Sequence, residues 1–130
     1  MKAVDLRSMN IDQLIERFAA IGEAQYQALE QHEDWIEDKA NVSFNKLFAQ
    51  MNDVDLELRA RGREARLALQ GLYDHPNVQV RLKAAKRTLA VAPEAARHVI
   101  EAVANSKWYP QAGEAGMTLW NLDNGTFKPD

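Results

Sequence analysis

The spacing of apolar residues along the chain predicts helices throughout. Apolar positions recur at i, i+3, i+4 and i+7, which is the period of an amphipathic helix, and no stretch keeps the β-branched alternation of a strand. Two long stripes dominate the N-terminal half, one made of Leu14, Phe18, Ile21 and Leu29, the other of Phe44, Leu47, Phe48, Met51, Val54 and Leu58. The pattern predicts an all-α protein.

Capping residues set the bounds of the first two predicted helices. Asn10, with Gln13 three residues later, forms an N-cap with a partial capping box. The second helix should run from about Ala40 to Ala60 and stop at Gly62. We expect the charged segment 32–38 to connect the two.

Beyond Gly62 the predicted elements become shorter. Prolines and one asparagine mark their ends: a helix of about ten residues closes before Pro76, Asn77 caps the next, and Pro93 and Pro110 open two more. Their inward positions are Ala65, Leu69 and Leu72, then Val78, Leu82, Ala85 and Leu89, then Ala96, Val99, Ile100 and Val103. The last helix should end near Leu122, before Asn124-Gly125.

One stretch resembles a HEAT repeat, a helix–turn–helix unit with Asp-x-Pro in the turn and Val-Arg-x-x-Ala-Ala in the second helix. The matching residues are Leu72, Asp74, Pro76, Val80, Arg81, Ala84, Ala85 and Leu89. A shift of 31 residues gives a degenerate second copy, in which Ala115-Gly116 align with the two alanines and the turn lacks its aspartate. The resemblance implies a short HEAT-like α-α superhelix of about six helices.

The chain as a whole also resembles small bacterial HEAT-like proteins of uncharacterised function, through residues 57–62 (ELRARG), the repeat and residues 115–119 (AGMTL). This resemblance implies a fold and no activity. We expect a single domain over residues 1–130, with 1–62 as longer capping helices, 63–122 as two HEAT-like helix pairs and 123–130 as a tail. HEAT-like proteins in general bind protein partners on the surface of a solenoid.

Asp74 and Arg81 are predicted to form a structural pair. Asp74 is short enough to accept N–H groups at the start of the following helix, and Arg81 lies about one turn into that helix. A charge-assisted bond between them would brace the turn. We therefore interpret Arg81 as structural and not catalytic.

Charge is distributed unevenly along the chain. The net charge of −3 combines −7 over residues 1–58, +6 over 59–107 and −2 over 108–130. Such asymmetry indicates either an interaction face or attraction between the two halves within the fold.

A basic face is the candidate binding surface. Lys83, Lys86 and Arg87 are spaced i, i+3 and i+4, opposite the predicted inward stripe, and Arg59 and Arg63 flank the preceding turn together with Arg61 and Arg66. We expect an acidic protein surface as the partner, because the acidic first half would repel phosphates. The simpler interpretation is a solvated face.

Catalytic chemistry has little support in the sequence. The chain has no cysteine and three histidines, of which His98 lies near Glu94 and Glu101, and His32 near Glu33 and Glu37. These are too few ligands for a metal centre, and no glycine-rich phosphate loop follows a strand. We expect neither an enzyme nor a bound metal or cofactor.

Three aromatic residues, Trp108, Tyr109 and Trp120, admit two interpretations. They could seal the end of the core, which we favour, or they could form a platform on which bases stack.

The sequence thus supports a non-enzymatic protein-interaction module. The alternative is a nucleic-acid-binding or base-repair-like HEAT-fold protein, which the negative net charge and the small number of helices disfavour. Charges near the start leave no apolar run of signal-peptide length, and no stretch has the length of a membrane span. We expect a cytoplasmic protein that does not associate with membranes.

Overall fold

All regular elements that the structure describes are helical. The computed structural model describes residues 5–30 and 37–130, with side chains from residue 44 onward in the second range. Within these ranges lie the α-helices α1 (Ile11–Glu30), α2 (Glu37–Ala60), α3 (Arg63–Leu67), α4 (Val78–Thr88), α5 (Pro93–Asn105) and α6 (Gln111–Asp123). Two short 3-10 helices accompany them, η1 (Leu6–Ser8) and η2 (Ala68–Leu72). The all-α prediction is confirmed.

The chain divides into two compact units. Unit 1 spans Met1–Ala68 and unit 2 spans Leu69–Asp130. The first helix of the predicted repeat is therefore divided, because α3 belongs to unit 1 and the 3-10 turn that continues it lies almost wholly in unit 2. The arrangement of the chain as a HEAT-like superhelix stays a prediction.

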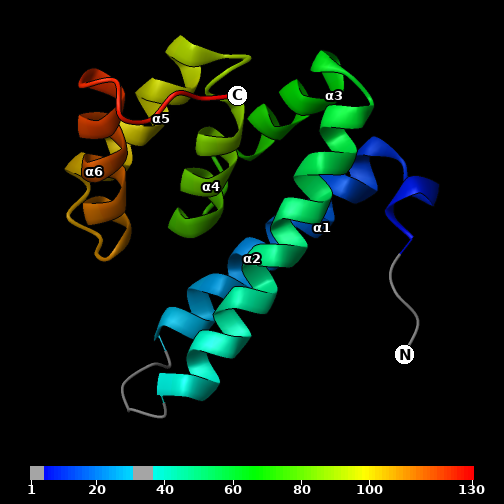
Figure 1. Ribbon diagram of the computed structural model, residues 1–130, viewed down its shortest axis with the longest axis horizontal. Coiled ribbons are helices and arrows are strands. Elements are labelled where there is room, and N and C mark those ends of the chain that lie inside the picture. The colour runs from blue at the N-terminus through cyan, green and yellow to red at the C-terminus, as the bar shows by residue number, and fades with distance from the viewer. Residues whose placement is uncertain (1–4, 31–36) are drawn as a thin grey trace. The chain divides into compact units, whose positions relative to one another are not determined.

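Unit 1 is built on the pair α1 and α2, which run side by side (Figure 1). The two predicted stripes supply its core, with Leu14, Phe18, Met51, Val54 and Leu58 fully buried. The stripe of α2 is less buried nearer its start, where Phe44 and Leu47 are half-buried and Phe48 is 42% exposed.

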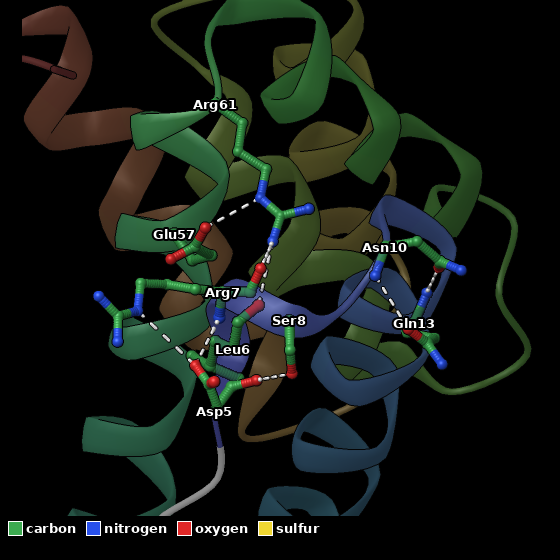
Figure 2. A network of polar contacts seen from close by, with 8 residues as sticks. All are labelled: Asp5, Leu6, Arg7, Ser8, Asn10, Gln13, Glu57 and Arg61. Carbon is green, nitrogen blue, oxygen red and sulfur yellow. Dashed lines mark hydrogen bonds and ion pairs between the residues drawn. The ribbon is translucent and has the colours of Figure 1, made fainter.

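The start of α1 carries the predicted capping box (Figure 2). The Gln13 N–H donates to Asn10 Oδ1 at 2.8 Å, and the Asn10 N–H donates to Gln13 Oε1 at 2.9 Å. Arg61, just after α2, fixes the segment before α1, because its Nη2 donates to the carbonyls of Leu6 and Arg7 at 3.0 and 3.3 Å. Its Nε binds Glu57 at 2.9 Å, which orients the guanidinium.

Unit 2 packs α4 and α6 against α5 (Figure 1). Helix α4 begins at the predicted cap, because Asn77 Oδ1 accepts the N–H groups of Gln79 and Val80. The buried residues of α4 occur on most of its circumference: Val78, Gln79, Val80, Leu82, Lys83, Ala84, Ala85 and Thr88. Helix α4 is therefore buried around most of its circumference and does not have a single inward stripe.

Candidate functional site

The predicted basic face is largely an internal ion-pair cluster. Lys83 is 8% exposed, and its Nζ lies 2.6 Å from Glu114 Oε2 on α6. Lys86 Nζ lies 3.0 Å from the same oxygen. The expectation that the inward stripe forces these lysines into solvent is wrong, because α6 covers that side of α4 and supplies a carboxylate.

Burial and charge oppose each other in this cluster. Burial lowers the pKa of Lys83, and the attraction of Glu114 offsets this only in part. Burial alone would raise the pKa of Glu114, but Lys83 and Lys86 together hold that pKa below its ordinary value. The carboxylate is thus ionised at neutral pH and committed to the two lysines.

A buried amide pair lies beside the ion pairs on the same two helices. Gln111 Nε2 donates to Gln79 Oε1 at 3.0 Å, and each residue is 1% exposed. Burying polar groups of this size is unfavourable unless they are hydrogen-bonded. The contact between α4 and α6 is therefore polar along part of its length.

The arginines of the predicted face lie in different parts of the chain. Arg87 belongs to α4, in unit 2, and is half-buried. Arg59 and Arg63 belong to unit 1, where Arg59 Nε binds Asp55 at 3.1 Å and Arg63 is exposed at the start of α3. The structure brings Lys83 and Lys86 together at Glu114, and Arg59 and Arg63 belong to the other unit.

Arg81 has a different partner from the one predicted. Its Nη1 donates to the carbonyls of His75 and Pro76 at 2.7 and 3.2 Å, and no contact with the Asp74 carboxylate occurs among the described residues. Asp74 is exposed, and Asn77 makes the cap bonds that were assigned to it. The guanidinium still braces the turn, but through backbone carbonyls.

The three aromatic residues do not seal the core. Trp108 is 51%, Tyr109 67% and Trp120 66% exposed, and Met117 joins them at 59%. All four lie on α6 or the turn before it. The preferred interpretation of the aromatics is therefore wrong.

Three of these residues and two glycines form what we call the α6 outer face: Tyr109, Gly113, Gly116, Met117 and Trp120. From Gly113 onward they are spaced i, i+3, i+4 and i+7, so they share one side of the helix, while Gln111, Ala112, Ala115 and Thr118 are buried on the other. A Cβ at Gly116 would meet nothing within 4 Å, and one at Gly113 would lie 3.8 Å from the Tyr109 ring. The same i, i+3, i+4, i+7 spacing was present in the sequence but was not assigned to a surface.

The α6 outer face carries no charge. The charged residues of α6 are Glu114 and Asp123. Glu114 is bound by α4, and Asp123 makes a two-pronged ion pair with Arg97 of α5, at 2.9 and 3.2 Å. Both charges are thus committed to neighbouring helices.

A second feature of unit 2 is an open depression of about 400 Å³ lined by Leu89, Ala90, Pro93, Arg97, Leu122 and Pro129. Its one charged side chain is Arg97, which already binds Asp123 and Glu101. The depression is therefore mostly apolar, and its one cation is paired with two carboxylates.

No group of three or more metal-binding side chains assembles among residues 5–30 and 44–130. His98 is exposed, and Glu101, its predicted neighbour, binds Arg97 at 3.3 Å. His75 accepts the Asn77 N–H on Nδ1. His32 lies outside the described residues. Within the described part of the chain, no helix combines the length and apolarity that crossing a membrane requires.

Comparison with known proteins identifies a family whose function is unknown. A protein-family model described as a domain of unknown function, DUF2019, matches residues 12–123. The chain belongs to the DUF2019 family. The crystal structure of the protein RPA1889 from Rhodopseudomonas palustris matches with a TM-score of 0.87 and 46% sequence identity, covering 98% of this chain and 100% of that one.

These matches agree with the expected resemblance to proteins of unknown function, and the HEAT-like part of that resemblance stays a prediction. No curated protein matches the chain.

Proposed function

We propose that this DUF2019 protein is a non-enzymatic protein-interaction module and that it binds through the α6 outer face. The observation that carries the proposal is the exposure of Tyr109, Met117 and Trp120, each more than half accessible on one side of a helix. Aromatic residues and methionine are the types enriched at protein interfaces. Clusters of large apolar side chains on a surface mark binding sites.

The charges of unit 2 support an apolar surface over a basic one. Lys83 and Lys86 are at the centre of the basic face that the sequence predicts as a site for an acidic partner. Both share the Glu114 carboxylate. Their long-range field is weakened by that carboxylate, whereas the α6 outer face offers apolar area with no competing charge. The proposed contact therefore lies on α6 and not on α4.

Affinity capture with matched variants tests the proposal. The protein with Tyr109→Ala and Trp120→Ala should lose a partner that the unaltered protein retains. The control carries Phe48→Ala and Leu56→Ala, which removes two exposed apolar side chains of unit 1 and should leave capture unchanged. Equal capture by both double variants would rule out the α6 outer face as the binding surface.

Salt dependence separates the apolar contact from a basic one. Apolar binding should persist when salt is raised from about 0.05 M to about 0.5 M, because added salt screens charges and leaves apolar burial intact. A partner released by salt would instead support binding through Lys83, Lys86 and Arg87.

Single-stranded nucleic acid is the second candidate ligand. The exposure of Trp108, Tyr109 and Trp120 favours it, because stacking platforms need accessible rings. The commitment of Lys83 and Lys86 to Glu114 disfavours it, since such platforms accompany a basic groove that follows the backbone. Fluorescence anisotropy with labelled oligonucleotides tests this: tight binding that is lost in Trp120→Ala would replace the protein partner with a nucleic acid.

A further inference from the structure

We propose that the occupant of the α6 outer face is a second copy of this chain, docked so that the two α6 helices run antiparallel. The inference rests on the proposed function, because it names the partner of the same face. Three properties of the face carry it: the order of large and small residues, the charges at its ends and its area.

Four of the five residues of the face follow a palindromic order of large and small side chains, and Met117 is the exception. Tyr109 and Trp120 are at the two ends, and Gly113 and Gly116 are symmetric about the same midpoint. Reversal of the direction of α6 therefore places Tyr109 opposite the partner's Trp120, and Gly113 opposite the partner's Gly116.

Gly116 allows a close approach of a second helix, whereas a Cβ at Gly113 would lie 3.8 Å from the Tyr109 ring of the same copy. Position 116 has open space where a side chain would be, so the backbone of a second helix can approach there. Trp120 lies about 8 Å along the helix axis from the midpoint, at a rise of about 1.5 Å per residue. Each indole would thus extend beyond the crossing point and lie against the partner's Tyr109, where aromatic rings pack favourably.

Charges at the two ends favour the antiparallel direction. Lys107 lies just before the face, and its N-terminal end is therefore positive. At the other end Asp123 and Glu101 share Arg97, which leaves one net negative charge. Antiparallel docking places the positive end of each copy near the negative end of the other, whereas parallel docking would place like charges together.

The area of the face suits a weak, symmetric dimer. Its three large side chains and the adjacent Trp108 are 51–67% exposed, and aromatic side chains of this size present about 150–250 Å² each. The apolar area on one copy is therefore on the order of 400–500 Å². Specific interfaces bury about 800 Å² per partner, so flanking residues must supply the remainder and we expect micromolar association.

The test compares one glycine variant with a matched glycine variant elsewhere in unit 2. Gly116→Leu introduces a side chain into open space in a single copy, and leucine is a better helix former than glycine, so the fold should be kept. The same side chain would obstruct the approach of the second helix. Gly71→Leu is the control, because position 71 is also open and exposed but lies in η2, away from the face.

Sedimentation velocity at about 1–100 µM gives the readout. We expect the unaltered protein and Gly71→Leu to shift from monomer to dimer over this range, and Gly116→Leu and Trp120→Ala to associate at least tenfold more weakly, with unchanged helical circular dichroism. An unaltered protein that stays monomeric at 100 µM overturns the second copy as partner, while the capture experiment still decides whether the face binds another protein. A dimer that tolerates both Gly116→Leu and Trp120→Ala overturns this face as its interface.

Disulfide trapping tests the antiparallel direction. The chain has no cysteine, so Gly113→Cys and Gly116→Cys each introduce a single thiol. Because Gly113 faces the partner's Gly116, mild oxidation of a mixture of the two variants should give more covalent dimer than oxidation of either alone. Equal yields from the mixture and from the single variants would contradict the antiparallel arrangement.

Discussion

The ion pairs of the two units differ in what they connect. In unit 1 the pairs Arg59–Asp55 and Arg61–Glu57 each join positions i and i+4 at the C-terminal end of α2. In unit 2 Arg97 makes one such pair with Glu101, but the principal pairs join separate helices: Lys83 and Lys86 to Glu114, and Arg97 to Asp123.

This difference explains why the surfaces differ. Ion pairs within a helix leave each helix with its own charged side, and the large exposed apolar residues that the structure describes in unit 1, Ile11, Phe48 and Leu56, are scattered along α1 and α2. Pairs between helices draw the charges of α6 toward α4 and α5, so its remaining side is apolar and exposed.

The largest expected effect on stability comes from a comparison of a buried and an exposed aromatic residue, Phe18 and Trp120. Phe18→Ala should lower the free energy of unfolding by about 3–5 kcal/mol, because it empties a fully buried site in unit 1. Trp120→Ala should change that free energy by less than about 1 kcal/mol, because its ring is mostly in solvent. Urea denaturation at submicromolar protein measures both. A loss above about 2 kcal/mol for Trp120→Ala would show that the ring is structural.

The next largest effect concerns the buried ion-pair cluster. Glu114→Gln should destabilise the protein by about 1–3 kcal/mol, because it leaves Lys83 buried without its carboxylate. Lys83→Met in the same background should restore part of the loss, since it removes the uncompensated charge. Glu94→Gln, an exposed carboxylate on α5, is the control and should have little effect. Strictly additive losses for Glu114→Gln and Lys83→Met would contradict the coupling.

Acid should weaken the same cluster over a defined range of pH. The folded-state pKa of Glu114 is lower than its ordinary value of 4.5, so its ionisation contributes stability that is complete above about pH 4.5. This contribution is lost as the pH falls through the lowered pKa. The difference in unfolding free energy between the unaltered protein and Glu114→Gln should therefore shrink below pH 4.5, which urea denaturation at a series of pH values measures. A difference independent of pH down to about pH 2 would contradict this role.

The smallest expected effect distinguishes Arg81 from Asp74. Arg81→Ala should cost about 1–2 kcal/mol, because the carbonyls of His75 and Pro76 lose a charged donor. Asp74→Ala should be nearly neutral, since Asp74 is exposed and has no contact with Arg81 in the described structure. Thermal unfolding of the single and double variants should give additive changes. A coupling free energy above about 0.5 kcal/mol between Asp74 and Arg81 would support the predicted pair.

Sequence pattern predicted the helices because their signals are local. The capping box at Asn10 and Gln13, the cap at Asn77 and the start of α5 at Pro93 all depend on residues within a single turn. The inward stripe of α1 was likewise correct for Leu14 and Phe18.

The candidate site was mispredicted because its determinants are far apart in the chain. Lys83 looked solvated since the helix carrying Glu114 lies 31 residues later, and nothing in the spacing of α4 indicates that α6 covers it. Trp120 looked like a core residue because large aromatics are commonly buried, whereas Ala112 and Ala115 occupy the inward side of α6.

The polar contact between α4 and α6 also determines how these helices align lengthwise. The amide pair Gln79–Gln111 and the ion pair Lys83–Glu114 join the two helices at nearly the same sequence separation, and the two contacts lie about one helical turn apart. If α6 slid along α4 by one turn, Glu114 would move away from Lys83, and a buried cation and buried amides would lose their partners together. A purely apolar contact between the helices would tolerate such sliding better than this polar one, because apolar contacts are not directional. We therefore expect these few polar atoms to favour the observed alignment of the two helices over its neighbours.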